Sequence, residues 1–199
     1  MIPAIESVKD LDTKLIVAID RIARVQRNLI WEKAKLYGLY PLQAQILLYL
    51  IENKPENCII TKLSLEFGVS QPTISSSVKA LIKKGLIQAV TWEKNKHFKI
   101  LTITESGKEL VKKLLDWDYY LKKPLKSIPE DEKIKAYSFL LSYVVKLRND
   151  KTLLLAKACP LCKYCTVNER GKYYCKLFNM EMEIKDLRIN CSDFEESTV

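Results

Sequence analysis

The stretch from Ile60 to Thr102 constrains the fold of this chain most, because it places the end of one helix and the start of the next within three residues. Gly68 stands where a helix ends in a left-handed residue. Ser70 then supplies a hydroxyl N-cap, and Pro72 is tolerated in the first turn that follows. Two helices joined by so short a turn predict a helix-turn-helix.

The second of these helices has one apolar and one polar face. Its apolar residues recur at i, i+4, i+7 and i+8 as Ile74, Val78, Leu81 and Ile82. The other face offers short hydrogen-bonding side chains and lysines, with no acid before Glu93, and such groups suit phosphates and base edges. On this helix we expect DNA contacts from Gln71, Pro72, Thr73, Ser75, Ser76, Ser77, Lys79 and Lys83.

A basic hairpin is predicted after Gly85. Residues 86–92 and 98–102 are rich in β-branched and aromatic types, which favours two strands, and residues 58–60 predict a short third strand beside them. The tip adds the expected DNA contacts Lys94, Asn95, Lys96 and His97. The formal net charge is +9, and residues 79–126 hold 12 lysines against 5 acidic residues. This concentration of positive charge indicates a phosphate-backbone partner, although a merely solvated lysine-rich face is the alternative.

Long helices are predicted on both sides of this unit, so the fold class is mainly α with a small sheet. A helical pattern from about Val8 to Tyr37 has an apolar side broader than one small domain needs, which indicates contact with a second subunit. Pro41 opens a helix that runs to Ile51. Further helices are predicted from Glu105 to Leu121, capped by Thr104, and from about Glu130 to Arg148.

This order of elements resembles the MarR family of regulators over about Val8 to Leu147. The best matches are Leu39-Tyr40-Pro41-Leu42-Gln43, Gly85-Leu86-Ile87, and Leu101-Thr102-Ile103-Thr104 leading to Gly107. The resemblance implies a non-enzymatic transcriptional repressor. It would act as a homodimer on double-stranded DNA, with its two recognition helices in successive major grooves. The resemblance is also compatible with a small-molecule effector.

The wing departs from that family, whose members usually carry an Asp and an Arg there. The tip residues of this chain include no arginine. Lysine binds phosphate as a point charge and forks poorly to base edges. We therefore expect this wing to add affinity more than sequence discrimination.

The C-terminal region differs from the rest of the chain because it holds five of the six cysteines. Two-residue spacings let thiolates turn back onto one ion, as tetrahedral zinc favours, and the segment is too short to hold a core alone. The spacing predicts a structural zinc site in a module of residues 151–199, distinct from a DNA-binding and dimerisation domain of residues 1–150. A [4Fe–4S] cluster is the alternative, and redox-active or inert thiols are a further one. The candidate ligands are Cys159, Cys162, Cys165, Cys175 and Cys191.

Zinc takes four ligands, so one of the five thiols would be spare. We expect Cys159 to be that thiol and to react with oxidants, because Cys162 and Cys165 lie next to the rest of the module. A Cys159→Ser protein would then keep its DNA affinity in peroxide. Cys58 stands alone in the sequence and is interpreted as a small buried apolar residue.

Other function classes have less support. The chain shows no nucleotide-cradling glycine loop and only 5 glycines, which disfavours a redox enzyme built on the cysteines. A winged helix that binds protein is a third class, which weak salt dependence of binding would reveal. No stretch reaches the apolar length of a membrane span and the N-terminus has no secretory pattern, so we expect a cytoplasmic protein without membrane contact.

Overall fold

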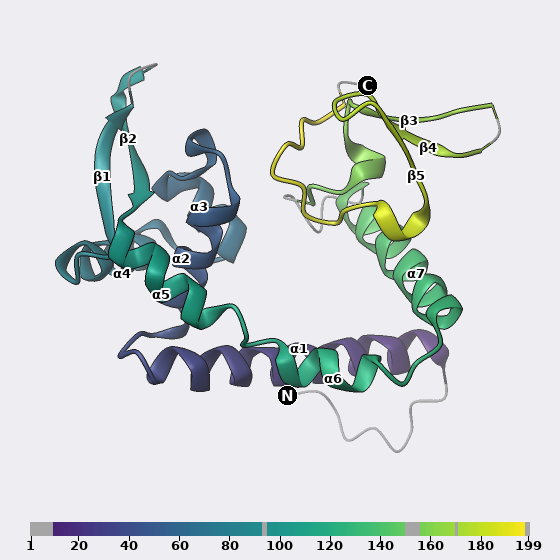
Figure 1. The fold of residues 1–199 in the computed structure, drawn as a ribbon, viewed down its shortest axis with the longest axis horizontal. Coiled ribbons are helices and arrows are strands. Elements are labelled where there is room, and N and C mark those ends of the chain that lie inside the picture. The colour runs from purple at the N-terminus through teal and green to yellow at the C-terminus, as the bar shows by residue number, and fades with distance from the viewer. Residues whose placement is uncertain (1–9, 93–94, 150–155, 170, 198–199) are drawn as a thin grey trace.

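The structure is a computed structural model that describes residues 10–92, 95–149, 156–169 and 171–197; for residues 95–98 and 149 it describes the backbone alone. The chain is mostly helical with two small sheets, which confirms the predicted fold class. Figure 1 shows a winged-helix part on the left and a cysteine-rich part on the upper right, with the long first helix below them. Among the described residues, no helix has the length and apolar character needed to cross a bilayer.

Two helices lead into the winged-helix part. Helix α1 (Leu11–Lys35) begins at Asp10, whose carboxylate accepts a 2.8 Å hydrogen bond from the backbone N–H of Thr13. Helix α2 (Pro41–Glu52) begins after Tyr40, whose N–H donates to the side-chain oxygen of the buried Gln43 at 3.2 Å. The Leu39–Gln43 motif thus serves as the entry to α2, as the resemblance implied.

The helix-turn-helix consists of α3 (Ile60–Phe67) and α4 (Gln71–Lys83), which follow α2 through the short η2 turn (Pro55–Asn57). Gly68 adopts φ 61°, the left-handed conformation that was predicted for the end of α3. Leu63, Ile74 and Leu81 are fully buried in one core with side chains of α2 and α5. The apolar stripe of α4 is buried at Ile74, Val78 and Leu81, whereas Ile82 at its end is 40% exposed.

The wing is an antiparallel hairpin of β1 (Ile87–Trp92) and β2 (Asn95–Ile103), with Ile87 opposite Ile103. Residues 93–94 lie outside the described part. The predicted third strand at residues 58–60 is not formed, because Ile60 already belongs to α3. One hydrogen bond of that expected pairing exists, from the N–H of Leu101 to the carbonyl of Cys58 at 2.8 Å.

The helix predicted over Glu105–Leu121 is interrupted. Helix α5 (Glu105–Leu114) ends in a turn, and a separate helix α6 (Tyr119–Leu125) follows. In the turn, Asp116 pairs with Lys33 of α1 at 2.5 Å, and Trp117 lies against the junction of α1, α2 and α5. These tertiary contacts favour the turn over continued helix. Helix α7 (Glu130–Asn149) agrees with the prediction.

The C-terminal segment forms a second, smaller core. It contains η3 (Cys159–Leu161), the meander β3 (Cys165–Val167), β4 (Tyr173–Cys175) and β5 (Met180–Met182), and η4 (Ile184–Asp186). Ala158, Met182 and Leu187 pack in this core against Leu141 of α7, and Figure 1 shows α7 beneath the segment. The predicted domain boundary at residues 150–151 falls in residues 150–155, outside the described part.

Candidate nucleic-acid interface and cysteine site

Helix α4 presents its polar face outward. Ser70 caps it by accepting from the N–H of Thr73, and burial of Ile74, Val78 and Leu81 fixes which face meets the core. Ser75 and Ser77 are partly buried at the edges of the polar face. The exposed members of the expected DNA-contact set are Gln71, Pro72, Thr73, Ser76, Lys79 and Lys83.

The lysines on this face are available to contact a negatively charged partner. Within the described part of the chain, Lys79 and Lys83 form no ion pair, and α4 contains no acidic residue. Lys94 lies outside the described residues. Asn95, Lys96 and His97 are placed in β2 by their backbone only, so their expected DNA contacts stay predictions.

All five clustered cysteines line one cavity of about 180 Å³ in the C-terminal segment. Its backbone explains the two-residue spacings, since the N–H of Cys162 donates to the carbonyl of Cys159 at 3.0 Å and the N–H of Cys165 to that of Cys162 at 2.9 Å. Each spacing closes one turn. Cys175 is the cross-strand partner of Cys165, and Cys191 reaches the cavity from the C-terminal loop.

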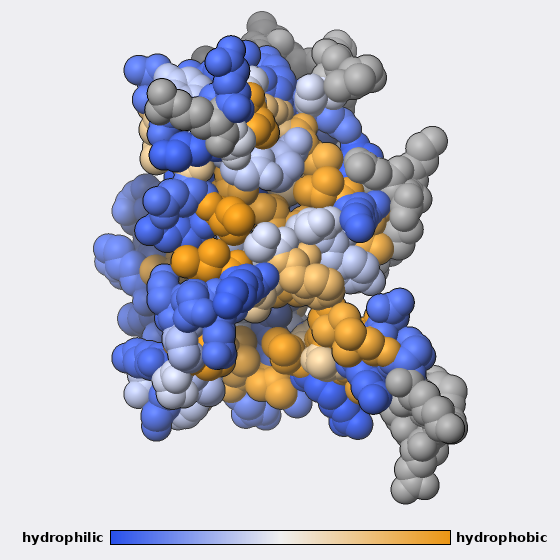
Figure 2. Space-filling model, turned by 90° about the vertical axis from the view of Figure 1, so that its right-hand side faces the viewer, coloured by the Kyte–Doolittle hydropathy of each residue, from blue (hydrophilic) through white to orange (hydrophobic). Residues whose placement is uncertain are grey.

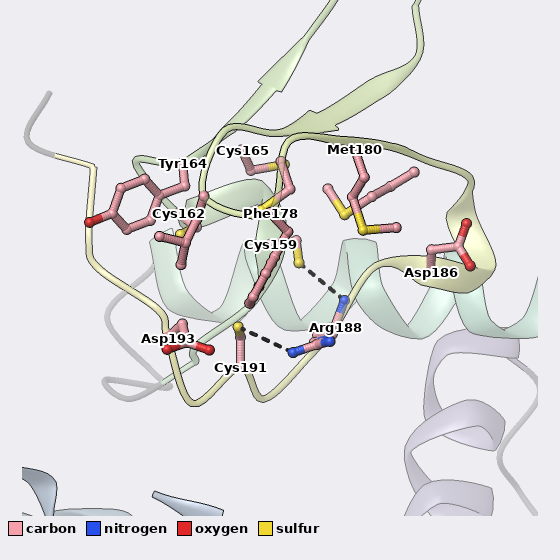
Figure 3. A pocket seen from close by; sticks show the side chains of 13 residues that line it. Cys159, Cys162, Tyr164, Cys165, Phe178, Met180, Asp186, Arg188, Cys191 and Asp193 are labelled. Atoms are coloured by element: carbon pink, nitrogen blue, oxygen red, sulfur yellow. Dashed lines mark hydrogen bonds between the residues drawn. The ribbon is translucent and has the colours of Figure 1, made fainter. Parts of the chain in front are cut away.

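Arg188 joins two of these thiols (Figure 3). Its backbone N–H donates to Cys159 Sγ at 3.2 Å, and its guanidinium Nη1 lies 4.0 Å from Cys191 Sγ. Asp193 lines the same cavity, whose apolar lining includes Phe178. Hydrogen-bond donors aimed at sulfur are the groups that stabilise thiolate ligands.

The six cysteines are all free thiols. Burial raises the pKa of Cys159, and it raises the pKa of Cys165 to about 11. No three Cys, His, Asp or Glu side chains in the described ranges converge as closely as one metal ion requires. The five thiols line the cavity, but no three of them meet at one point.

Cys58 and Cys159 are both buried, with different consequences for how the sequence was interpreted. Cys58 is buried, and its thiol lies 3.3 Å from the carbonyl of Lys54 outside the cysteine cavity, which agrees with its interpretation as a buried residue. Cys159 is also buried and accepts the Arg188 hydrogen bond. That placement argues against Cys159 as a spare, freely reacting thiol.

Sequence reasoning missed four charged residues around the cysteine site. Arg188 and Asp193 flank Cys191 closely, and that proximity was an available signal. Lys157 and Lys54 connect the C-terminal segment to the winged-helix part through Glu66 and Asp193 respectively. No pattern in the sequence marks these two lysines, because their partners lie far away along the chain.

The fold and the outward polar face of α4 define a winged helix-turn-helix protein with long flanking helices. Residues 37–91 match the model of the MarR family, which confirms the resemblance for the segment from the turn after α1 into β1. No curated protein sequence matches the chain.

Several solved structures share the fold. The MarR protein from Peptoclostridium difficile has a TM-score of 0.61 at 19% identity, over 72% of this chain and 93% of that one. The Staphylococcus aureus MepR–DNA complex has a TM-score of 0.57 at 18% identity, over 66% and 96%. CouR from Rhodococcus jostii RHA1, bound to p-coumaroyl-CoA, has a TM-score of 0.58 at 17% identity, over 68% and 95%. About one third of this chain therefore has no counterpart in these proteins.

Proposed function

We propose that this protein is a transcriptional regulator that binds double-stranded DNA through α4. The observation that carries the proposal is the solvent-facing side of α4, which combines hydroxyls, one amide and lysines that form no ion pair among the described residues, without an acidic residue. A helix of this composition suits the major groove. MepR, which shares the fold, is seen in complex with DNA.

Salt dependence tests this proposal. The logarithm of the DNA association constant should fall linearly with the logarithm of salt concentration, measured on a duplex selected from a random-sequence pool. Lys79→Ala should reduce the slope by about 1 if Lys79 contacts phosphate. Lys135→Ala is the matched control, because Lys135 is exposed on α7 and already paired with Asp131. A slope near zero would instead support a protein-binding winged helix.

Gln71 is the best candidate for reading a base. It is exposed in the first turn of α4, and an amide can pair with the adenine edge in two hydrogen bonds. Gln71→Ala should cost about 1–3 kcal/mol at one base pair and relax specificity there. Equal weakening on every sequence would identify a backbone contact.

The regulator would act as a homodimer through the apolar face of α1. Leu11, Ile16, Ile22 and Val25 are each half exposed or more, while burial in α1 is confined to its C-terminal end. So much exposed apolar surface on one helix indicates a partner. Ile22→Asp should shift the mass seen in sedimentation equilibrium from dimer to monomer. Asn28→Asp, an exposed polar position on α1, should leave the dimer intact.

We also propose that the protein represses transcription and that a small molecule releases this repression. A pocket of about 370 Å³ lies between the C-terminal half of α1 and the start of α6, a size typical of small-molecule sites. CouR, of the same fold, is bound to p-coumaroyl-CoA. In transcription with purified polymerase, the protein should lower transcript yield from a promoter that overlaps the selected duplex. A rise in yield would show activation.

The cysteine cavity would hold a thiolate-ligated metal centre, with zinc as the first expectation and an iron–sulfur cluster as the alternative. Support comes from the five thiols, which all line one cavity. Elemental analysis and the ultraviolet–visible spectrum of anaerobically purified protein test it. About one zinc per chain without visible absorption supports structural zinc, whereas iron with sulfide and a broad visible band supports a cluster.

A further inference from the structure

The cysteine segment touches the helix-turn-helix through Lys157, two residues before Cys159. Its ammonium lies 3.0 Å from Asn53 Oδ1, 3.3 Å from the Tyr49 hydroxyl and 3.6 Å from a carboxylate oxygen of Glu66. The side chains of Lys157 and Glu66 are only 13% and 20% exposed. Removing one partner from such a shielded pair would leave the other charge uncompensated, so loss of this contact is unfavourable.

The backbone around Lys157 belongs to the cysteine site. Its carbonyl accepts from the N–H of Cys191 at 3.1 Å, and it pairs with Asn190 in a parallel bridge. The N–H of Cys159 donates to the carbonyl of Arg188 at 2.9 Å. Residues 157–159 and 188–191 are therefore hydrogen-bonded side by side, and each carries a cavity cysteine. Any ligand that draws Cys159 and Cys191 together acts directly on the backbone that positions the Lys157 side chain.

A second contact joins the same two parts. The carboxylate of Asp193, which lines the cysteine cavity, lies 2.8 Å from Lys54 Nζ. Lys54 directly precedes the η2 turn, whose following residue Cys58 bonds to the wing strand β2 at Leu101. In Figure 1 the C-terminal chain, drawn in yellow, extends toward α2 and α3 where these contacts form.

Both contacts reach the elements that support the DNA-reading helix. Glu66 is in α3, which packs directly on α4 in the common core. The next residue, Phe67, meets the Tyr49 ring edge-on with 5.8 Å between centroids, so the Lys157 contact also spans the α2–α3 junction. A shift of Lys157 would change the packing of α3, and with it the orientation of α4.

We propose that metal occupancy of the cysteine cavity controls DNA affinity through the Lys157–Glu66 and Asp193–Lys54 contacts. This inference rests on the proposed DNA-binding function and adds its regulation. A thiophilic divalent ion holds residues 157–159 and 188–193 in register, which keeps Lys157 against Glu66 and α3 in place. Loss of the ion loosens the contact and weakens DNA binding. Coupling between two sites in proteins is commonly about 5- to 150-fold in affinity, and we expect about tenfold here.

The test compares zinc-stripped and zinc-reloaded full-length protein under reducing conditions. The affinity for the selected duplex should be about tenfold higher with zinc. The variant K157M/E66Q removes both charges together, so it avoids a stranded buried charge, and its zinc content should stay equal to that of the wild type. Its affinity should be the same with and without zinc. Lys163→Met is the matched control, since Lys163 pairs with Glu195 within the cysteine segment and should leave the tenfold response unchanged.

Hydrogen exchange of the α3 amides supplies a readout that needs no DNA. Zinc should slow exchange in the wild type and in the Lys163→Met protein, but not in K157M/E66Q. A tenfold zinc response in K157M/E66Q, or no zinc response in the wild type, would overturn the coupling. The proposed DNA-binding function is tested separately by the salt dependence of duplex binding, so it can hold when the coupling fails. If no duplex binds, the proposed function fails, and α3 exchange decides the coupling alone. Failure of zinc to bind overturns it outright.

Discussion

Gly107→Ala should destabilise the winged-helix part, although alanine normally stabilises a helix. Gly107 is buried in the first turn of α5, where its N–H donates to the Thr104 hydroxyl at 3.1 Å. An added Cβ would stand 2.6 Å from Ile103 Cγ1 and well inside contact distance of the Leu86 carbonyl oxygen. The Leu86 carbonyl is backbone at the entry to β1, so it cannot rotate away as a flexible side chain could.

The expected magnitude follows from three opposing effects. Alanine gains about 1 kcal/mol of helix propensity over glycine. Overpacking against a fixed neighbour costs about 1–3 kcal/mol. Moving α5 away from Leu86 also breaks the bonds of Thr104, whose N–H donates to the Leu86 carbonyl and whose hydroxyl caps α5, at a cost of about 1 kcal/mol. These terms sum to a net loss of about 1–3 kcal/mol in the free energy of unfolding, and we expect about 2 kcal/mol, the middle of that range.

Urea unfolding followed by far-ultraviolet circular dichroism measures this effect. A loss of about 2 kcal/mol should lower the midpoint on the order of 1 M. Ser106→Ala is the control, because Ser106 is exposed one residue earlier in α5. If the Gly107→Ala protein unfolds at the midpoint of the control or above it, the steric reasoning is refuted.

Three further predictions concern other contacts. Tyr137→Phe removes the α7 hydroxyl that donates to the Leu187 carbonyl, so the free energy of unfolding of the cysteine segment, measured in urea, should fall by about 1 kcal/mol. No change would mean that water replaces the bond. Burial raises the pKa of Cys58 to about 11, so peptide mapping after iodoacetamide at pH 8 should find Cys58 alkylated far more slowly in folded than in urea-unfolded protein, and equal rates would contradict its burial. The hydrogen bond from Lys33 lowers the pKa of Asp116, so its stabilisation is complete above the ordinary aspartate pKa of 3.8 and is lost as pH falls through the folded-state value. Asp116→Asn should therefore lower the urea midpoint at pH 7 but not at about pH 2, and an equal loss at both would rule out the ion pair.

The helix-turn-helix could be predicted from the sequence because its signals are local. The left-handed Gly68, the Ser70 cap and the Thr104 cap each act within a few residues of the backbone groups they satisfy. Likewise, the turns between Cys159, Cys162 and Cys165 follow from their spacing alone. Such features depend on backbone geometry that short stretches of chain already possess.

The errors arose where distant contacts compete with local preference. The helix predicted through residues 115–118 breaks because Asp116 and Trp117 make contacts with α1 and α2 that outweigh helix propensity. The third strand is absent because the helical signal of α3 begins at Ile60, which leaves a single hydrogen bond to β2.

The sequence by itself determined the elements of this protein: a capped recognition helix, a basic wing, an apolar first helix and a cluster of thiols. Only the tertiary structure decided that all five thiols share one cavity, and that Lys157 and Asp193 connect this cavity to α2 and α3. The physical reason is that lysine and glutamate are ordinarily solvated. Burial of Lys157 against Glu66 depends on two segments that meet only once both cores have formed.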